Sequence, residues 1–340
     1  MTHARLAAGA VLLALAAACG DAQVGTPASD TAADAARPQA LLVFASHDDE
    51  AFLPSLFADF TRETGIPVEV RHRDDAGNVS DVIGKLSSPQ PDVLITQSVA
   101  GAWLASQEGM LRPLASDSVA VGIPGWLQDP DGYWVALAYS TVVVAYAADT
   151  VARDRVTNYA SLGDPAFRGR VCLSSSSLAS NTALIANLVA AHGRRPAEIV
   201  VRDWIANLAV PPFKSEAALL DAIAAGRCGY GIVSMQAVVA WQKSKTGDAV
   251  AVHIPAPAYA DAVTAGVGRH ARSPEAAASF IDWLLEVSQQ RALAEGFDAV
   301  PAVARAMREG DAAYAADGNV SLIGANAGEA VLLSERARYR

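Results

Sequence analysis

Hydrophobic residues in the first part of the chain fall alternately into short continuous runs and into helical spacing. The runs at 41–46 (LLVFAS) and 91–96 (PDVLIT) end in polar residues, as buried parallel strands commonly do. Between them, residues 50–64 repeat large apolar side chains at helical spacing and are followed by Gly65, which favours a helix end. This alternation predicts an α/β fold with helices on both faces of a parallel sheet. Ligands of such folds bind beyond the carboxyl ends of the strands.

The same alternation continues through the second half of the chain. We predict strands at 66–72, 134–138 with 141–146, 169–174, 229–234 and 263–269, and helices at 181–192, 215–225 and 273–296. The chain of 340 residues is long enough for one large or two medium domains.

Composition excludes several classes of protein. The formal net charge of −10 lacks the basic footprint of a general nucleic-acid binder, so no nucleic-acid partner is predicted. With 52% hydrophobic and 18% charged residues, the chain is not intrinsically disordered. HExxH, GxSxG and P-loop motifs are absent, which argues against the common enzyme classes.

The N-terminus reads as a targeting segment. Arg5 precedes a short apolar core at 6–18, and the small residues that end this core lead directly to Cys19. This pattern resembles the lipobox of bacterial lipoproteins, which implies that 1–19 is a signal peptide ending in a lipidated Cys19. Ordinary secretion with cleavage near Ala18 is the alternative. Residues 20–39 contain few large side chains and are predicted to form a flexible linker.

Several segments, in this order, resemble the periplasmic solute-binding proteins of ABC importers, and within them the ferric-iron-binding group. They are TRETGIPVEV, SSPQPDVLI, EGMLRPL, DPDGYWVALA, DPAFRGRVCLSSSS, AAGRCGYGI, TAGVGRHARSPEAAASFIDWLLEVSQQ and FDAVPAV, within residues 41–303. The resemblance implies the two-lobed periplasmic-binding-protein type II fold, in which two α/β lobes joined by crossing strands close on a ligand.

The resemblance also implies the domain organisation and the partners. Lobe 1 is expected to comprise 40–138 and 260–300, and lobe 2 to comprise 139–259 and 301–340. The expected partners are an ABC permease and its ATPase, a small-molecule or metal ligand, and the membrane through the N-terminal lipid. We expect a monomer in the periplasm or on the outer face of the cytoplasmic membrane. No resident cofactor is predicted, and Fe³⁺ enters only as the transported ligand.

The metal ligands of the ferric-binding group are only partly present. Relatives carry a Tyr pair soon after the segment Gly226–Cys228, and the corresponding positions here are Gln236 and Ala237. A Glu of the relatives corresponds to Gln97. Oxygen ligands suit a hard ferric ion, so Asp48 and Tyr139 are the metal-ligand candidates that the resemblance leaves.

Two polar clusters are candidate ligand sites. His47, Asp48, Asp49 and Glu50 follow the first strand, where they could bind a cation or simply favour the start of the next helix. The serine cluster 174–177, with Ser180, Asn181 and Thr182, could form an anion site or an ordinary capped turn.

The strands that cross between the lobes supply further candidates. Tyr139 could face the cleft or serve in packing. Ser140 beside it, and Ser234 and Gln236 after the strand of the second lobe, could likewise face the cleft. The complete set of candidate ligand-binding residues is His47, Asp48, Glu50, Gln97, Tyr139, Ser140, Ser176, Ser177, Asn181, Ser234 and Gln236.

Cys172 and Cys228 remain once Cys19 is lipidated. In a secreted protein an even pair of cysteines indicates a disulfide, and two buried free thiols are the alternative.

Taken together, the sequence predicts a solute-binding lipoprotein of an ABC importer with ferric iron as its cargo by resemblance. A phosphonate or phosphate ester and a thiamine-like cation are the alternative cargoes. A metal-assisted hydrolase and a ligand sensor without a transporter are the alternative classes.

Overall fold

The computed structural model describes residues 39–46, 52–72, 90–114, 116, 119, 122–149, 156–245, 249–314, 316 and 318–340. The predicted signal peptide with Cys19, the linker up to residue 38 and the acidic cluster His47–Glu50 lie outside the described residues. Among the described helices, none has the length and apolar character that crossing a bilayer requires.

One sheet of ten strands organises the fold, and its main order is β2-β1-β3-β9-β5-β7-β6. In its first half, β1 (Leu41–Ala45) lies between β2 (Val68–His72) and β3 (Val93–Thr96), and all three strands run parallel. The antiparallel strand β9 (Ala260–Gly268) follows β3 and also pairs with the short β4 (Leu111–Arg112). The sheet is therefore mixed, whereas the sequence pattern predicted a parallel sheet.

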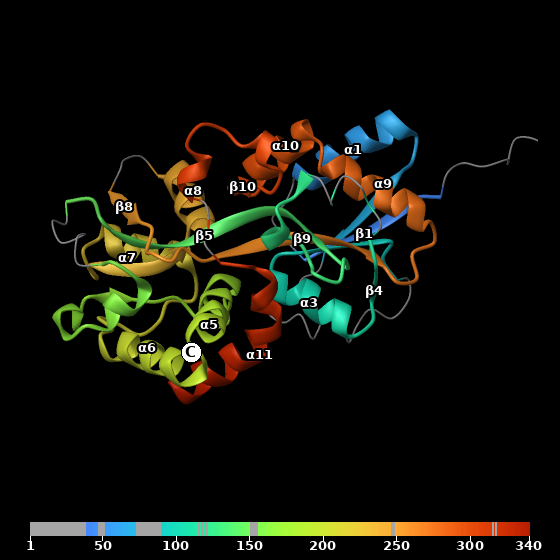
Figure 1. Cartoon of the computed structure of the whole chain (residues 1–340). Helices are drawn as coiled ribbons and strands as arrows, with labels where there is room; N and C mark the ends of the chain where they lie inside the picture. The colour runs from blue at the N-terminus through green and yellow to red at the C-terminus, as the bar shows by residue number, and fades with distance from the viewer. Residues whose placement is uncertain are drawn as a thin grey trace, which may run out of the picture. The chain divides into compact units, whose positions relative to one another are not determined.

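Strand β5 (Val135–Ala147) joins the two halves of the sheet, as Figure 1 shows at its centre. Up to Thr141 it pairs with β9 and with β10 (Val300–Pro301), and from Val142 onward it pairs with β7 (Tyr230–Ser234) and β8 (Val250–His253). The parallel pair of β7 and β6 (Val171–Cys172) completes the second half. We predicted two strands within 134–146, and a single strand of 13 residues occupies this stretch instead.

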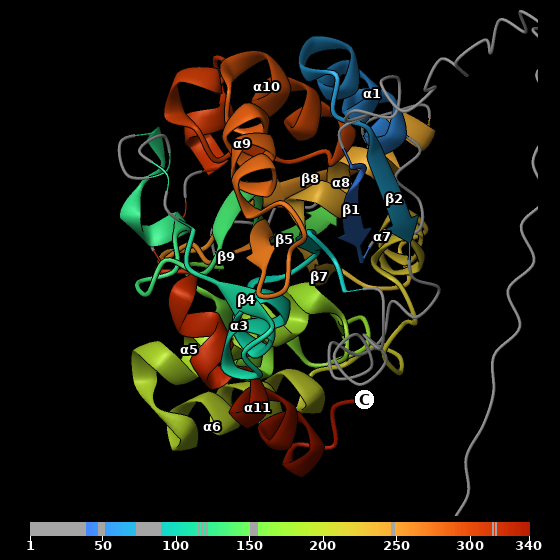
Figure 2. The same cartoon turned by 90° about the vertical axis from the view of Figure 1, so that its right-hand side faces the viewer.

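Helices cover both faces of the sheet (Figure 2). Helices α1 (Phe52–Thr64), α9 (Pro274–Leu284) and α10 (Val287–Gly296) lie on one face of the first half, and α3 (Val99–Gln107) lies on the other. The remaining helices are α5 (Ala179–His192), α6 (Arg194–Ala206), α7 (Glu216–Ala224), α8 (Met235–Ser244) and α11 (Ser321–Arg336). Short 3₁₀ turns include Gly125–Leu127, Tyr159–Gly163, Pro165–Phe167, Ala304–Ala306 and Asp311–Tyr314.

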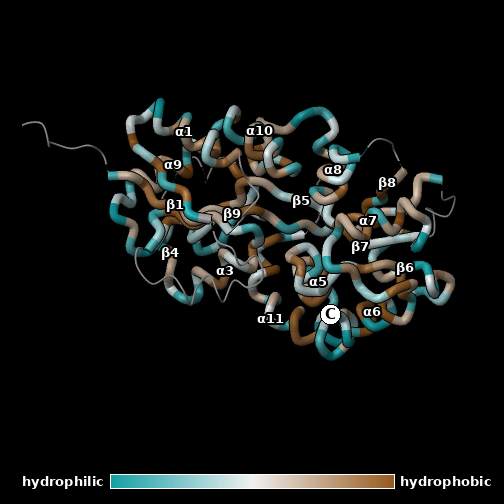
Figure 3. Tube along the Cα trace, turned by 180° about the vertical axis from the view of Figure 1, so that it is seen from behind, coloured by the Kyte–Doolittle hydropathy of each residue, from teal (hydrophilic) through white to brown (hydrophobic). Residues whose placement is uncertain are grey.

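The amphipathic helices bury their apolar sides as the sequence predicts. Helix α1 buries Phe57 and Phe60, and both rings make edge-to-face contacts with Phe280 of α9 at centroid distances of 5.0 and 4.9 Å. Helix α6, which the sequence analysis did not predict, also buries one side and leaves its arginines exposed, so hydrophilic and hydrophobic stretches alternate along it in Figure 3. The edge-to-face contacts of Phe57 and Phe60 with Phe280 add to the free energy gained by burying these rings.

The single helix predicted at 273–296 is two helices in the structure. The chain leaves the helical path between α9 and α10 at Leu285 and Glu286. The helical spacing of apolar residues continues through both helices, so the break leaves no mark on the periodicity. Gly296 ends α10, at the predicted C-terminal bound of the helix, and a side chain there would collide with the ring of Phe52 at 2.6 Å.

A disulfide joins Cys172 of β6 to Cys228, which precedes β7, and thereby confirms the predicted pairing.

The predicted lobe boundaries stay a prediction. The partners of β5 change between Thr141 and Val142, and α11 packs against α3 as well as against α5 and α6.

Candidate functional site

The point where β5 passes from one half of the sheet to the other carries a group of polar side chains. Ser140 of β5 lies opposite Asp261 of β9, and Val142 of β5 lies opposite Ser234 of β7. Opposed residues share a face of a sheet, and so do residues two apart on one strand. Asp261, Ser140 and Ser234 therefore occupy the same face. With Glu216 and Gln236, which contact these serines, we call this group the junction face.

Helix α8 begins on the junction face. The Ser140 hydroxyl oxygen accepts a hydrogen bond from the backbone N–H of Gln236 at 2.9 Å. The Ser234 hydroxyl oxygen accepts one from the N–H of Ala237 at 3.1 Å, which makes Ser234 the N-cap of the helix. The structure thus brings together three predicted site residues, Ser140, Ser234 and Gln236.

Glu216, from the first turn of α7, is a residue of this face that the sequence analysis missed. Its carboxylate accepts hydrogen bonds from the backbone N–H and the hydroxyl of Ser234, at 2.6 and 2.8 Å, and from the hydroxyl of Ser180 at 3.0 Å. Burial raises the pKa of Glu216, and these hydrogen bonds act in the opposite direction. In the sequence, this acid looks like an ordinary residue of a helix start.

Asp261 is the second residue of the face that the sequence analysis missed. Only 9% of its surface is exposed, and one carboxylate oxygen, Oδ1, accepts hydrogen bonds from the N–H groups of Val99 and Ala262 at 3.0 and 2.8 Å. The other oxygen, Oδ2, is buried without a hydrogen-bond partner among the described residues. Burial raises the pKa of Asp261 to about 7, against the effect of the two N–H groups.

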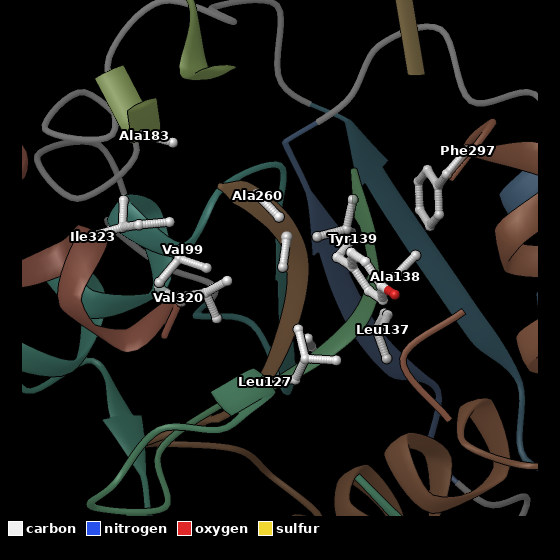
Figure 4. Close-up of a cluster of buried hydrophobic side chains, with 14 of the residues drawn as sticks. Val99, Leu127, Leu137, Ala138, Tyr139, Ala183, Ala260, Phe297, Val320 and Ile323 are labelled. Atoms are coloured by element: carbon white, nitrogen blue, oxygen red, sulfur yellow. The ribbon is translucent and has the colours of Figure 1, made fainter. Parts of the chain in front are cut away.

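Tyr139 points to the opposite face of β5 from Ser140, because neighbouring residues of a strand alternate. Its side chain is 1% exposed and meets the ring of Trp126 edge to face at 5.1 Å, within the apolar cluster of Figure 4. Burial, with a smaller effect from the charge of Asp311, raises the pKa of Tyr139 to about 12. A phenolate is therefore disfavoured in this form of the protein, and the metal role of Tyr139 stays a prediction.

The serine cluster is held in place by the protein's own hydrogen bonds. The side-chain amide of Asn181 donates to the carbonyl and hydroxyl oxygens of Ser174 and to the carbonyl oxygen of Ser175. The hydroxyl of Ser176 donates to the carbonyl oxygen of Tyr339 at 3.0 Å. Ser177 is exposed and its hydroxyl lies 2.9 Å from that of Ser175. These bonds hold the turn before α5, whose N-cap residue Leu178 makes no side-chain cap, and the anion role of the cluster stays a prediction.

At the carboxyl end of β3, Gln97 is exposed and its backbone N–H donates to the hydroxyl of Ser46 at 2.8 Å. His47, Asp48 and Glu50 would follow Ser46 but belong to the residues that the structure leaves undescribed. Within the described part of the chain, no group of three or more His, Cys, Asp or Glu side chains could hold a metal ion.

Comparison with known proteins identifies the family. Residues 55–321 match the sequence model of the bacterial extracellular solute-binding proteins. Iron uptake protein A1 of Synechocystis sp. is 30% identical over 175 residues, which are 50% of this chain and 48% of the relative. Iron uptake protein A2 of the same organism is 29% identical over 224 residues, or 62% of this chain and 65% of the relative. The chain thus spans between about half and two thirds of these curated relatives.

Solved structures share the fold over nearly the whole described chain. The Trichodesmium protein IdiA (FutA), in complex with iron and citrate ligands, superposes with a TM-score of 0.80 at 24% identity and covers 88% of this chain and 100% of its own. The ferric binding protein from Campylobacter jejuni gives a TM-score of 0.78 at 20% identity, with coverages of 88% and 100%. The fold is that of the two-lobed type II binding proteins, and the chain belongs to the family of bacterial extracellular solute-binding proteins.

Proposed function

We propose that this protein is the solute receptor of an ABC importer and that its cargo is ferric iron. The observation that carries the proposal is the junction face, which lies where one strand passes from the first half of the sheet to the second. A ligand held at such a place contacts both halves, so its binding favours the closed arrangement of a hinged protein. Family membership supports the role in solute capture.

The proposal of iron rests on the relatives. Two of them are named iron uptake proteins, and one superposable structure holds iron with citrate. Gln236 and Ala237 stand where we placed the Tyr pair, so the ion must rely on other oxygen donors, among them those of a bound chelator. Citrate is a carboxylate chelator of this kind.

The alternative oxyanion cargo has less support. An anion would need free N–H and hydroxyl donors, and the donors that Asn181 and Ser176 could offer are engaged within the protein. The N–H groups of Gln236 and Ala237 at the start of α8 are likewise taken by serine hydroxyls. A phosphonate or phosphate ester would have to displace these hydrogen bonds.

The remaining parts of the proposal concern location and partners. We place the protein in the periplasm or on the outer face of the cytoplasmic membrane, anchored by a lipid on Cys19. It acts as a monomer that hands its cargo to the permease, while the ATPase supplies the energy of transport. Family membership supports a role in transport, and we propose no hydrolase activity.

A thermal-shift screen of the purified protein tests the cargo. Ferric citrate should raise the unfolding temperature, because a ligand at a hundredfold excess over its Kd stabilises by about 2.7 kcal/mol. Methylphosphonate and thiamine serve as the competing probes, and citrate without iron is the control. A shift with methylphosphonate and none with ferric citrate would contradict the iron proposal.

A further inference from the structure

We propose that the junction face binds a positively charged group of the cargo, with Asp261 Oδ2 in direct contact with it. The inference rests on the proposed role as a solute receptor and specifies the charge that the site selects. It holds for a cationic metal and for an organic ammonium alike, because both provide the positive charge that a free carboxylate oxygen accepts.

The geometry places two carboxylates along one polar line. Asp261 lies opposite Ser140, whose hydroxyl contacts the first turn of α8. Ser234 begins the same helix and carries both hydrogen bonds to Glu216 described above. The line therefore runs from β9 across β5 to α7 and ends in an acid on each side. Ser140 and Gln236, in the middle of this line, are partly exposed to solvent.

The two acids lack basic partners. Among the described residues, no Lys, Arg or His forms an ion pair with Asp261 or Glu216, and no positive charge acts on either carboxyl. Each carboxylate is held by N–H or hydroxyl groups alone. When Asp261 and Glu216 are ionised, no basic side chain of the described residues compensates their negative charge, which then attracts a cation.

A second buried acid of the same chain shows what a purely structural carboxylate looks like here. Asp92 is 1% exposed and pairs with the guanidinium of Arg272 at 2.7 Å. Its two oxygens also accept hydrogen bonds from the N–H groups of Leu42 and Arg272. Asp92 is fully satisfied by the protein, whereas Asp261 leaves one oxygen without a donor. Buried polar atoms are nearly always paired. Among those that lack a partner in the described part of the chain, Oδ2 of Asp261 is the only carboxylate oxygen, which makes it the one suited to a cation.

The free oxygen also fixes the kind of group that it can receive. An ionised carboxylate only accepts hydrogen bonds or coordinates a cation. The hydroxyls of Ser140 and Ser234 already accept bonds from α8, and Ser234 donates to Glu216. The free Oδ2 of Asp261, once ionised, offers an acceptor to a cation and no donor to an oxyanion.

Binding titrations with matched variants test the inference. The purified mature protein is titrated with ferric citrate, thiamine and methylphosphonate, in the wild-type form and as Asp261→Asn, Glu216→Gln and Glu335→Gln. The amide of Asp261→Asn keeps the oxygen that accepts from Val99 and Ala262 and removes the charge. Glu335 is an exposed acid of α11 and serves as the control.

We expect Asp261→Asn to weaken binding of the probe that supplies the cationic centre, the ferric ion of ferric citrate or the thiazolium of thiamine, roughly 10- to 150-fold, the range for a hydrogen bond to a charged partner. Glu216→Gln should weaken it less, because its oxygens are already bonded within the protein, and Glu335→Gln should leave it unchanged. The unfolding temperature of Asp261→Asn without ligand should stay at or above that of the wild type. A parallel fall in stability and affinity would instead mean that Asp261 acts only as a cap of α3, and would overturn the inference.

The outcomes separate this inference from the iron proposal. Binding of ferric citrate that is unaffected by Asp261→Asn overturns the inference and leaves iron as the cargo. Binding of thiamine but not of ferric citrate, lost in Asp261→Asn, supports the inference and overturns iron. Binding of methylphosphonate alone, or of none of the three probes, overturns both.

Discussion

The hydroxyl oxygen of Ser140 accepts a hydrogen bond from the backbone N–H of Gln236 at 2.9 Å, across a sequence separation of 96 residues. This bond ties the strand that both halves of the sheet share to the first turn of α8. Ser140 also lies opposite Asp261 in the pairing of β5 with β9, so one serine stands between α8 and the acid of the junction face.

Ser140→Ala should lower the free energy of unfolding by about 1 kcal/mol, because the N–H of Gln236 loses its acceptor in a partly buried place. Chemical denaturation measures the change. Ser244→Ala is the matched control, since that hydroxyl donates only to a carbonyl of its own helix, at Trp241. Equal stabilities of the two variants would contradict the role given to Ser140.

The stability of the protein should depend on the protonation of Asp261. Burial raises its pKa from 3.8 to about 7, so between these values the folded protein holds a proton that the unfolded chain has released. The contribution of Asp261 to the free energy of unfolding therefore falls as the pH rises from about 4 to about 7, and is constant above.

Asp261→Asn removes this titration. The unfolding free energy of the variant minus that of the wild type should accordingly rise between about pH 4 and pH 7 and then level off. Urea denaturation at a series of pH values measures the difference. A difference that does not change with pH would show that the carboxyl titrates normally in the folded protein.

The disulfide between Cys172 and Cys228 closes a loop with a sequence separation of 56. The chain-entropy argument assigns about 4 kcal/mol to a loop of this size. The double variant Cys172→Ala/Cys228→Ala should lose most of this stability while retaining the fold. Mass spectrometry of the unreduced wild type should find the two cysteines linked, and free thiols at both positions would refute the bridge in the protein as made.

The C-terminal segment should control the order of the serine cluster. The hydroxyl of Tyr339 donates to the carbonyl oxygen of Ser174 at 2.6 Å, and the carbonyl oxygen of Tyr339 accepts from Ser176. Tyr339→Phe removes the first bond and should speed amide hydrogen exchange in residues 174–178, with exchange in β1 unchanged as the internal control. Exchange at the wild-type rate in both regions would show that Asn181 alone holds the turn.

Attachment to the membrane is a separate prediction from the N-terminal pattern. Cys19→Ser should release the protein from membranes or block its processing, because the acylated side chain is lost. Cell fractionation followed by immunodetection measures both. Membrane attachment and processing equal to those of the wild type would contradict the lipoprotein assignment.

Much of the fold could be predicted because it follows from local patterns. The run that forms β1 and the helical spacing that forms α1 are complete within a few residues, and Gly65 ends α1 with a positive φ of 74°. The order of strands around β5 could not be read in this way. Pairing of β5 with β7 and β9 joins segments far apart in the sequence, and only the resemblance indicated crossing strands.

The candidate site was predicted in part for the same reason. Ser234 and Gln236 stand at and just after the end of β7, where a ligand is expected in this class of fold, and Ser140 was expected on a strand that crosses between the lobes. Asp261 was missed because the strand was expected to begin at Val263 rather than at Ala260, which left Asp261 outside the predicted sheet. Glu216 was missed because its partners, Ser180 and Ser234, are 36 and 18 residues away.

The iron proposal is tested most directly by the iron that the protein retains. The purified protein is mixed with ferric citrate and desalted, and the iron content and visible spectrum of the protein fraction are measured. We predict that iron stays with the protein in stoichiometric amount. The intense colour of phenolate–iron coordination should be absent, because Gln236 and Ala237 replace the Tyr pair and Tyr139 is buried. A protein fraction that leaves the column free of iron would contradict the proposal that this chain captures ferric iron.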